Sequence, residues 1–185
     1  MNVLLISEDK LKSYTSLNDN VFGKVIFPAI KTAQDIYLQE IIGTALMVKL
    51  QTLIKENQIG ANENAGYKTL LDDYISPYLI YQTLVGLVPE VANKIVNLGV
   101  VQNNDEHTTN TYQGERELIR GQYQTYADAY CRLLQKYLCS NKANYPELCE
   151  ANQAVRPTLD SSATCSIWLG GKRRVYIPNN DHKKD

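Results

Sequence analysis

Apolar residues recur at helical spacing along most of the chain, and capping residues and prolines divide this pattern into segments. Ser7 is followed by two acidic residues and predicts an N-cap for a first helix that ends near Tyr14. Pro28, Pro77 and Pro89 each stand where a helix is expected to begin, because proline is tolerated in a first turn and costly further inside.

The helix expected from Pro28 continues to Gly43, which is predicted to stop it. The apolar residues that keep its helical spacing are Ile30, Ala33, Ile36, Tyr37 and Ile41. Thr44 is predicted to cap the next helix, over residues 45 to 57, and residues 60 to 66 form a polar loop.

The helical pattern resumes at Tyr67 and meets Ser76 and Pro77. These two residues fit either the start of a new helix or a proline kink in one long helix. Residues 89 to 98 are predicted to form a short helix that Gly99 ends.

The longest amphipathic segment covers residues 115 to 139 and predicts a helix with one apolar face, rich in tyrosine. That face is expected to carry Ile119, Tyr123, Tyr126, Tyr130, Leu133, Leu134 and Tyr137. The opposite face is expected to carry Arg120, Gln124, Asp128, Arg132 and Gln135. A tyrosine buries a large ring but keeps a polar hydroxyl, so this face suits a partly wet contact surface or the boundary of a thin helical domain.

Two segments break the helical pattern. Residues 102 to 114 are almost wholly polar, and a connection of this length is long for a helical bundle. Residues 163 to 178 alternate around Gly170 and Gly171, which predicts a β-hairpin. Such a hairpin is marginally stable alone, so we expect it to pack on its own bundle or on a neighbouring subunit.

The predicted fold is therefore all-α: a small bundle of about five to six helices with a long polar loop and a C-terminal β-hairpin extension. We expect a helical domain over residues 1 to 150, an extension with the hairpin over 151 to 178, and a disordered tail over 179 to 185. Residues 144 to 152 are a possible last turn of the helical domain.

Charge and composition argue against some function classes. The 185 residues contain 19 Lys plus Arg and 20 Asp plus Glu, so the chain as a whole is not a nucleic-acid or membrane-surface binder by its electrostatic field. The N-terminus lacks a signal-peptide pattern, and no apolar run reaches the roughly 18 residues that a membrane span needs. We expect a soluble protein made without a signal peptide.

The cysteines and histidines do not indicate a metal site or a catalytic site. No C-x-x-C pair occurs among the four cysteines, Cys131, Cys139, Cys149 and Cys165. We expect reduced thiols. His107 follows Asp105 and Glu106 in the polar loop, where consecutive side chains rarely converge on one ion, so a solvated loop is favoured over a metal site. No cofactor and no catalytic residue is expected.

Three tracts resemble head-to-tail connector proteins of tailed bacteriophages, and the likeness is greatest to phages of Bacteroides-like hosts, including the crAss-like group. The tracts are residues 28 to 43 with the following Leu46, the Tyr-Ile-Ser-Pro-Tyr-Leu motif that begins at Tyr74, and the run from Asn97 to His107. The resemblance covers approximately residues 1 to 150 and leaves out the tail.

The resemblance implies a helical adaptor that forms a ring of about a dozen copies. It implies that one face docks on the portal protein, that the other receives the next ring or a tail protein, and that genomic DNA passes through the lumen without sequence-specific contacts. The protein would then be a virion component at the head-tail interface, assembled in the host cytoplasm. It transfers no catalytic residues.

Two predicted segments are the candidate partner-binding sites of such a connector. The hairpin offers Trp168, Lys172, Arg173, Arg174 and Tyr176, and the polar loop offers Asp105, Glu106 and His107. The alternative is a helical DNA-binding or regulatory module that uses the basic hairpin tip, residues 172 to 174, on phosphates. An enzyme is the third hypothesis.

Overall fold

The computed structural model describes residues 3–15, 23–96, 99–102 and 113–159. The α-helices are α1 (Glu8–Tyr14), α2 (Gly23–Thr32), α3 (Gln39–Lys55), α4 (Ala65–Thr69), α5 (Ser76–Ala92) and α6 (Gln113–Ser140). Two π-helices, η1 (Ala33–Leu38) and η3 (Leu70–Ile75), lie between α2 and α3 and between α4 and α5. Short 3₁₀ turns are η2 (Asn62–Asn64), η4 (Lys142–Asn144) and η5 (Pro146–Cys149). The predicted helical fold is confirmed for the described residues.

The predicted count of five to six helices cannot be compared directly with the structure. The elements α2, η1 and α3 follow one another without a gap, and so do α4, η3 and α5. The predicted C-terminal hairpin lies outside the described residues. A different antiparallel pair is present, β1 (Asn93–Val96) with β2 (Gly99–Gln102), in which Asn93 pairs with Gln102. The predicted helix over residues 89 to 98 is therefore wrong, since β-branched residues on both sides of residues 97 and 98 favour strands.

The prolines do not begin helices as predicted. Pro28 is inside α2, and Pro89 is in the last turns of α5. Ser76 and Pro77 continue one helical rod, because the Ser76 N–H bonds the Leu71 carbonyl in the i to i−5 register of η3. Of the two alternatives, the structure therefore has one long helix that continues through Pro77.

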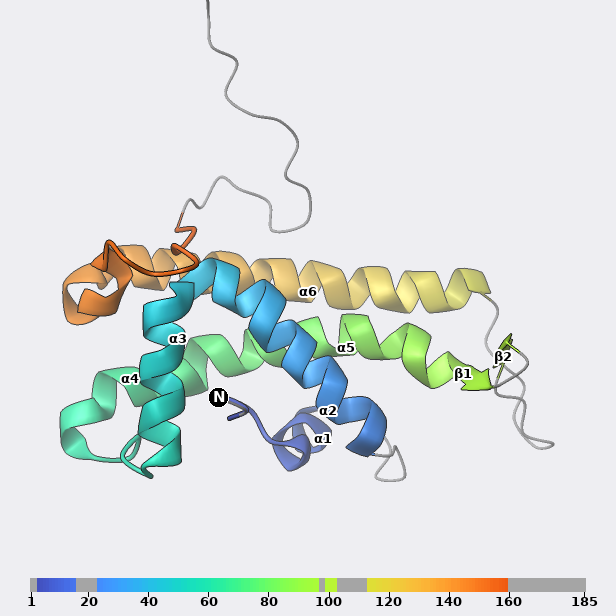
Figure 1. Cartoon of the computed structure of the whole chain (residues 1–185). Helices are drawn as coiled ribbons and strands as arrows, with labels where there is room; N and C mark the ends of the chain where they lie inside the picture. Colours follow the sequence, from blue (N-terminus) through green and yellow to red (C-terminus); the bar gives the residue numbers. More distant parts are fainter. Residues whose placement is uncertain (1–2, 16–22, 97–98, 103–112, 160–185) are drawn as a thin grey trace, which may run out of the picture.

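Gly43 breaks α3, as predicted, with φ at 80° and ψ at 167°. In Figure 1 the blue and teal helices meet at an angle near this break, and the orange C-terminal segment lies beside it. Residues 153–158, which we call the C-terminal strap, are hydrogen-bonded there: Thr158 N–H donates to Glu40 O (3.0 Å) and Ala45 N–H to Gln153 Oε1 (3.2 Å). The start of the predicted extension is thereby attached to the helical domain.

The helix predicted from residue 115 to 139 is confirmed as α6, but its buried face is rotated from the predicted one. The side chains of α6 that are buried completely are Ala127, Cys131, Leu134 and Leu138. Ile119, Tyr126 and Leu133, which were predicted on the apolar face, are 42%, 40% and 51% exposed. Gln135, which was predicted on the polar face, is 1% exposed and donates to the Thr158 carbonyl of the strap (3.0 Å).

Tyrosines fill the seam between α6 and the α4–η3–α5 rod, which lie side by side in Figure 1. Tyr81 packs on Tyr130 with ring centroids 5.5 Å apart, and Tyr74 stacks on Tyr137 at 3.9 Å. Tyr67 meets Tyr145 edge to face at 5.5 Å. Because this pairing runs in opposite directions along the two elements, they are antiparallel, and the tyrosines are used within the fold.

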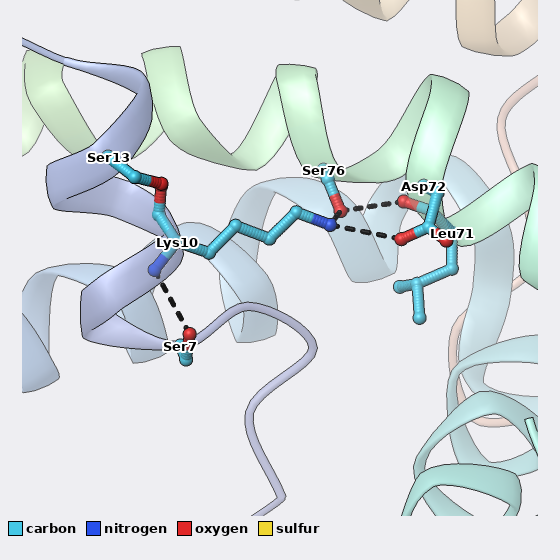
Figure 2. A network of polar contacts seen from close by, with 6 residues as sticks. All are labelled: Ser7, Lys10, Ser13, Leu71, Asp72 and Ser76. Carbon is cyan, nitrogen blue, oxygen red and sulfur yellow. Dashed lines mark hydrogen bonds and ion pairs between the residues drawn. The ribbon is translucent and has the colours of Figure 1, made fainter.

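Exposed and partly buried hydrogen bonds hold the N-terminal helix. Ser7 caps α1 as predicted, its Oγ accepting from the Lys10 N–H (3.1 Å). Figure 2 shows the Lys10 side chain reaching from α1 to the η3–α5 junction, where Nζ donates to Asp72 Oδ1 (3.0 Å) and Ser76 Oγ (2.9 Å). The Ser76 hydroxyl donates in turn to Leu71 O (2.7 Å). Lys10 thus connects α1 to η3 and α5 by hydrogen bonds.

Within the described part of the chain, no helix is both long enough and apolar enough to cross a membrane.

Candidate interaction surfaces

The site residues predicted from the sequence all lie outside the described residues. They are Trp168, Lys172, Arg173, Arg174 and Tyr176 of the hairpin and Asp105, Glu106 and His107 of the polar loop. Candidate surfaces therefore come from the helical domain itself.

A groove of about 370 Å³ lies between the α2–η1 rod and α5. Its walls are mainly apolar and include Val25, Ala29 and Val85. Pro28 and Pro89, which lie inside α2 and α5, also line it, one from each wall. A proline has no N–H to donate to the carbonyl four residues earlier and therefore loosens the helical ladder on its wall.

Gln82 is the most buried polar side chain of this groove, with 6% of its surface exposed. No hydrogen bond joins its amide to another described residue, which sets it apart from Gln34, whose amide bonds both Leu5 N–H and Val3 O. The nitrogen and oxygen of this amide are not among the buried side-chain atoms that lack a partner in the described part of the chain, so the amide is open to water in the groove.

Charged side chains stand at the groove's rim. Lys24 and Glu90 make no ion pair with another described residue, and Arg120 of α6 reaches Glu117 only at 3.6 Å. That pair is about half exposed on both sides, so it contributes little to stability. The rim is thus free to pair with charges of an incoming partner.

Gly86 leaves additional room in the groove. A Cβ built on it would meet no atom within 4 Å, although the glycine is inside α5 and has no positive φ. Glycine costs about 0.5–1 kcal/mol relative to alanine inside a helix. Because Gly86 has no side chain, this wall of the groove is open at Gly86, whereas the neighbouring positions carry side chains.

A ridge of exposed apolar side chains follows one side of α6. We call Leu118, Ile119, Tyr126 and Leu133 the α6 ridge; Leu118, at 75% exposed, is the most exposed of the large hydrophobic side chains described. The last three are seven residues apart and so form a stripe of about 21 Å. Exposed apolar side chains along a helix are candidates for a protein contact.

A second exposed apolar surface lies on the outside of α2 and η1. Phe27 and Ile36 are 47% and 60% exposed and flank the ion pair of Lys31 with Asp35, over a shallow depression of about 400 Å³. Ile36 and Tyr37, which keep helical spacing in the sequence, are exposed here. Both lie inside η1, whose wider turn directs side chains differently from an α-helix.

The tyrosine hydroxyls at the far end of the domain form a local network. Tyr67 donates to Glu147 Oε1 (2.8 Å), and Tyr145 donates to the Gly66 carbonyl (3.0 Å). Burial, then the hydrogen bond and charge of Glu147, raise the pKa of Tyr67 to about 12. Burial and the neighbouring Tyr137 also raise the pKa of Tyr145. Both phenols are therefore neutral near pH 7 and serve as structural hydrogen-bond donors.

Neither the sequence period nor the composition pointed to the groove. Its lining comes from three segments far apart in the chain, the α2–η1 rod, α5 and Arg120 of α6, and Pro28 and Pro89 were predicted only as helix starts. Within the described ranges, no three His, Cys, Asp or Glu side chains are grouped as metal ligands would be.

Comparison with known families gives one match. The model of a family described as "Family of unknown function (DUF6712)" matches residues 38–158. The matched region begins just before the Gly43 break and ends at the last residue of the strap, so it contains both partners of that contact. No curated protein and no solved structure matches the chain.

Proposed function

This chain belongs to the DUF6712 family, a family of unknown function, and we propose that it is a structural virion protein of a tailed bacteriophage. In this proposal it forms the head-to-tail connector ring that docks on the portal vertex and links it to the tail, with DNA passing through the lumen. Its partners are further copies of itself, the portal protein and the next ring or tail protein.

One observation carries the proposal: a single helical domain presents two unlike contact surfaces. The groove between α2 and α5 is concave, and the α6 ridge is convex. A two-fold dimer needs only one self-complementary patch, whereas a closed ring needs two different patches that fit each other. The groove and the α6 ridge are two different surfaces, which supports a ring more than a two-fold dimer.

The positions of the sequence resemblance support the same proposal. Residues 28 to 43 include most of the α2–η1 wall of the groove, and the motif that begins at Tyr74 runs into α5, which forms the other wall. The first tract therefore contributes residues to the groove, whereas the second ends in the first turn of α5, before Gln82, the first α5 residue that lines the groove.

Quantitative mass spectrometry of purified particles of the phage that encodes this chain tests the proposal. We expect the protein in particles at a one-to-one or small-integer ratio to the portal protein. If the protein is abundant in infected-cell lysate and absent from particles, the connector proposal is wrong. Binding to duplex DNA that weakens steeply with salt would then favour the DNA-binding alternative.

A further inference from the structure

We propose that the C-terminal strap is a releasable wedge in a helix with two states. While the strap is bound, α3 is bent at Gly43, and when the strap leaves, residues 33–55 close into one continuous helix. This switch is independent of the connector function, because it involves only contacts within one copy of the chain.

The strap occupies both halves of a missing helical hydrogen bond. In a continuous α-helix each N–H donates to the carbonyl four residues earlier, so the Thr44 N–H would donate to Glu40 O. Here the Thr44 N–H donates to Val155 O at 3.0 Å, and Glu40 O accepts from the Thr158 N–H at 3.0 Å. The strap thus holds apart a donor and an acceptor that would otherwise bond each other.

The next donor of the helix is diverted in the same way. The Ala45 N–H, whose partner in a continuous helix would be Ile41 O, donates to Gln153 Oε1 at 3.2 Å. Gly43, just before these donors, has φ at 80° and ψ at 167°, far from helical values. Once the strap has left, closing the helix gives both N–H groups a partner again.

The attachment of the strap permits its release. None of residues 153–158 is buried, and hydrogen bonds attach them to α3 on one side and, through Gln135 Nε2 and Thr158 O (3.0 Å), to α6 on the other. Segments with few buried apolar contacts open locally at a lower free energy than the core does. The strap is therefore expected to detach without unfolding of the whole domain.

Packing decides which state dominates. The second half of α3 carries apolar side chains that are fully buried, including Leu46 and Leu50. Straightening moves them relative to the core, so the straight form is the minor one, below about 10% of the molecules. A partner that binds residues 153–158 binds only the released form and therefore raises its population. The strap thus makes the bend of α3 depend on what binds the C-terminal part of the chain.

Native-state hydrogen exchange of the unmodified chain, followed by NMR, tests the switch. After correction for intrinsic rates, the amides of Thr44 and Ala45 are expected to exchange at least about tenfold more slowly than those of Val155 and Thr158. The reason is that helix closure protects the first pair again and leaves the second pair in water. Equal corrected rates for the four amides would mean that α3 stays open when the strap leaves, and would overturn the proposal.

A distance across the bend gives a second readout in the full-length chain. Spin labels at Thr32→Cys and Lys55→Cys, two exposed positions, would lie about 35 Å apart in a straight helix and closer together in the bent one. The labelled chain carries Ser in place of Cys139, Cys149 and Cys165, and keeps the fully buried Cys131. Pulsed electron paramagnetic resonance measures the two populations, and the shorter distance is expected to dominate.

Proline substitutions in the strap then shift these populations. Val155→Pro with Thr158→Pro removes the two N–H groups that the strap donates to α3 and is expected to raise the fraction of the longer distance at least about threefold. Adding Gly43→Ala is expected to raise it further. Alanine favours a continuous helix, and its Cβ would lie 2.5 Å from Gln153 Oε1 only while the strap is bound.

The matched control is Val155→Ala with Thr158→Ala, which keeps both N–H groups and is expected to leave the distances unchanged. An equal shift in this control contradicts the proposal. So does an unchanged distance in the proline variant when its circular dichroism is native-like. If the proline variant does not fold, the exchange rates of the unmodified chain decide.

Discussion

Thr44 and Val155, 111 residues apart, exchange two hydrogen bonds: the Thr44 N–H donates to the Val155 carbonyl at 3.0 Å, and the Val155 N–H donates to Thr44 Oγ1 at 3.0 Å. The break at Gly43 frees backbone groups of α3 that a continuous helix would use internally. The strap satisfies them. The chain's C-terminal part therefore completes a helix near its beginning.

Replacing Thr44 by Val keeps the shape of the side chain and removes the acceptor of the Val155 N–H. We expect a loss of about 1–2 kcal/mol in the free energy of unfolding, because Thr44 Oγ1 accepts hydrogen bonds from both Val155 N–H and Gln39 Nε2 and the substitution removes both. Urea unfolding followed by circular dichroism measures this change. Thr52→Val is the control, since the Thr52 hydroxyl is exposed and bonds only Val48 O of its own helix. Equal losses in the two variants would contradict a special role of the strap.

Gly43 is a position that only glycine occupies without strain. Its φ is +80°, and an added Cβ would lie 2.5 Å from Gln153 Oε1 and 2.9 Å from Pro157 Cδ. Gly43→Ala is expected to lower the free energy of unfolding by about 1–3 kcal/mol. Gly86→Ala, in open space inside α5, is expected to raise it by about 0.5–1 kcal/mol. The two thermal denaturation midpoints should therefore shift in opposite directions, and a shift in the same direction would refute this account of the break.

The stacked pair of Tyr74 and Tyr137 is expected to be energetically coupled. Their ring planes are 20° apart at a centroid distance of 3.9 Å. In a double-mutant cycle with Leu at both positions, we expect a coupling of about 0.5–1.5 kcal/mol. Tyr81 and Tyr123, whose centroids are 6.5 Å apart, are the comparison pair and should show a smaller coupling. A larger value for the distant pair would mean that the seam is held by burial alone.

Tyr67 should make the fold sensitive to alkaline pH. Its pKa is raised from 10.0 to about 12, chiefly by burial and then by Glu147. Below pH 10 the phenol is neutral in both states; above it the unfolded chain releases the proton first, so stability falls as pH rises from 10 to about 12. Tyr67→Phe removes this contribution, and the decline between those pH values should be less steep in the variant than in the wild type. Identical slopes in pH-dependent urea unfolding would show that the Tyr67 phenol does not contribute.

Lys10 is expected to fix α1 on the helical rod. Lys10→Met removes the donor to Asp72 and Ser76 while it keeps most of the aliphatic stem. We expect a loss of about 0.5–1.5 kcal/mol and faster amide hydrogen exchange in α1, because the ion pair is partly exposed and the serine is buried. Lys68→Met, at an exposed position of α4, is the control and should change neither quantity. Unchanged exchange in the Lys10 variant would show that apolar contacts alone dock α1.

Several features of the fold were readable from local chemistry. The Ser7 cap, the stop at Gly43 and the extent of α6 each depend on residues within a turn or two of one another, and the structure has all three. Inward and outward faces were predicted less well. On α6, Gln135 was predicted on the polar face and is buried, whereas Leu133 was predicted on the apolar face and is exposed.

By itself, then, the sequence determined that the chain is helical and where several helices begin and end, because caps, glycines and apolar spacing act over a few residues. Only the tertiary structure decided that α6 buries Cys131 and exposes Leu133, that Gln82 lines a groove, and that Val155 bonds Thr44. Such relationships join residues distant in the chain. Their free energy comes from packing between elements, which no local pattern records.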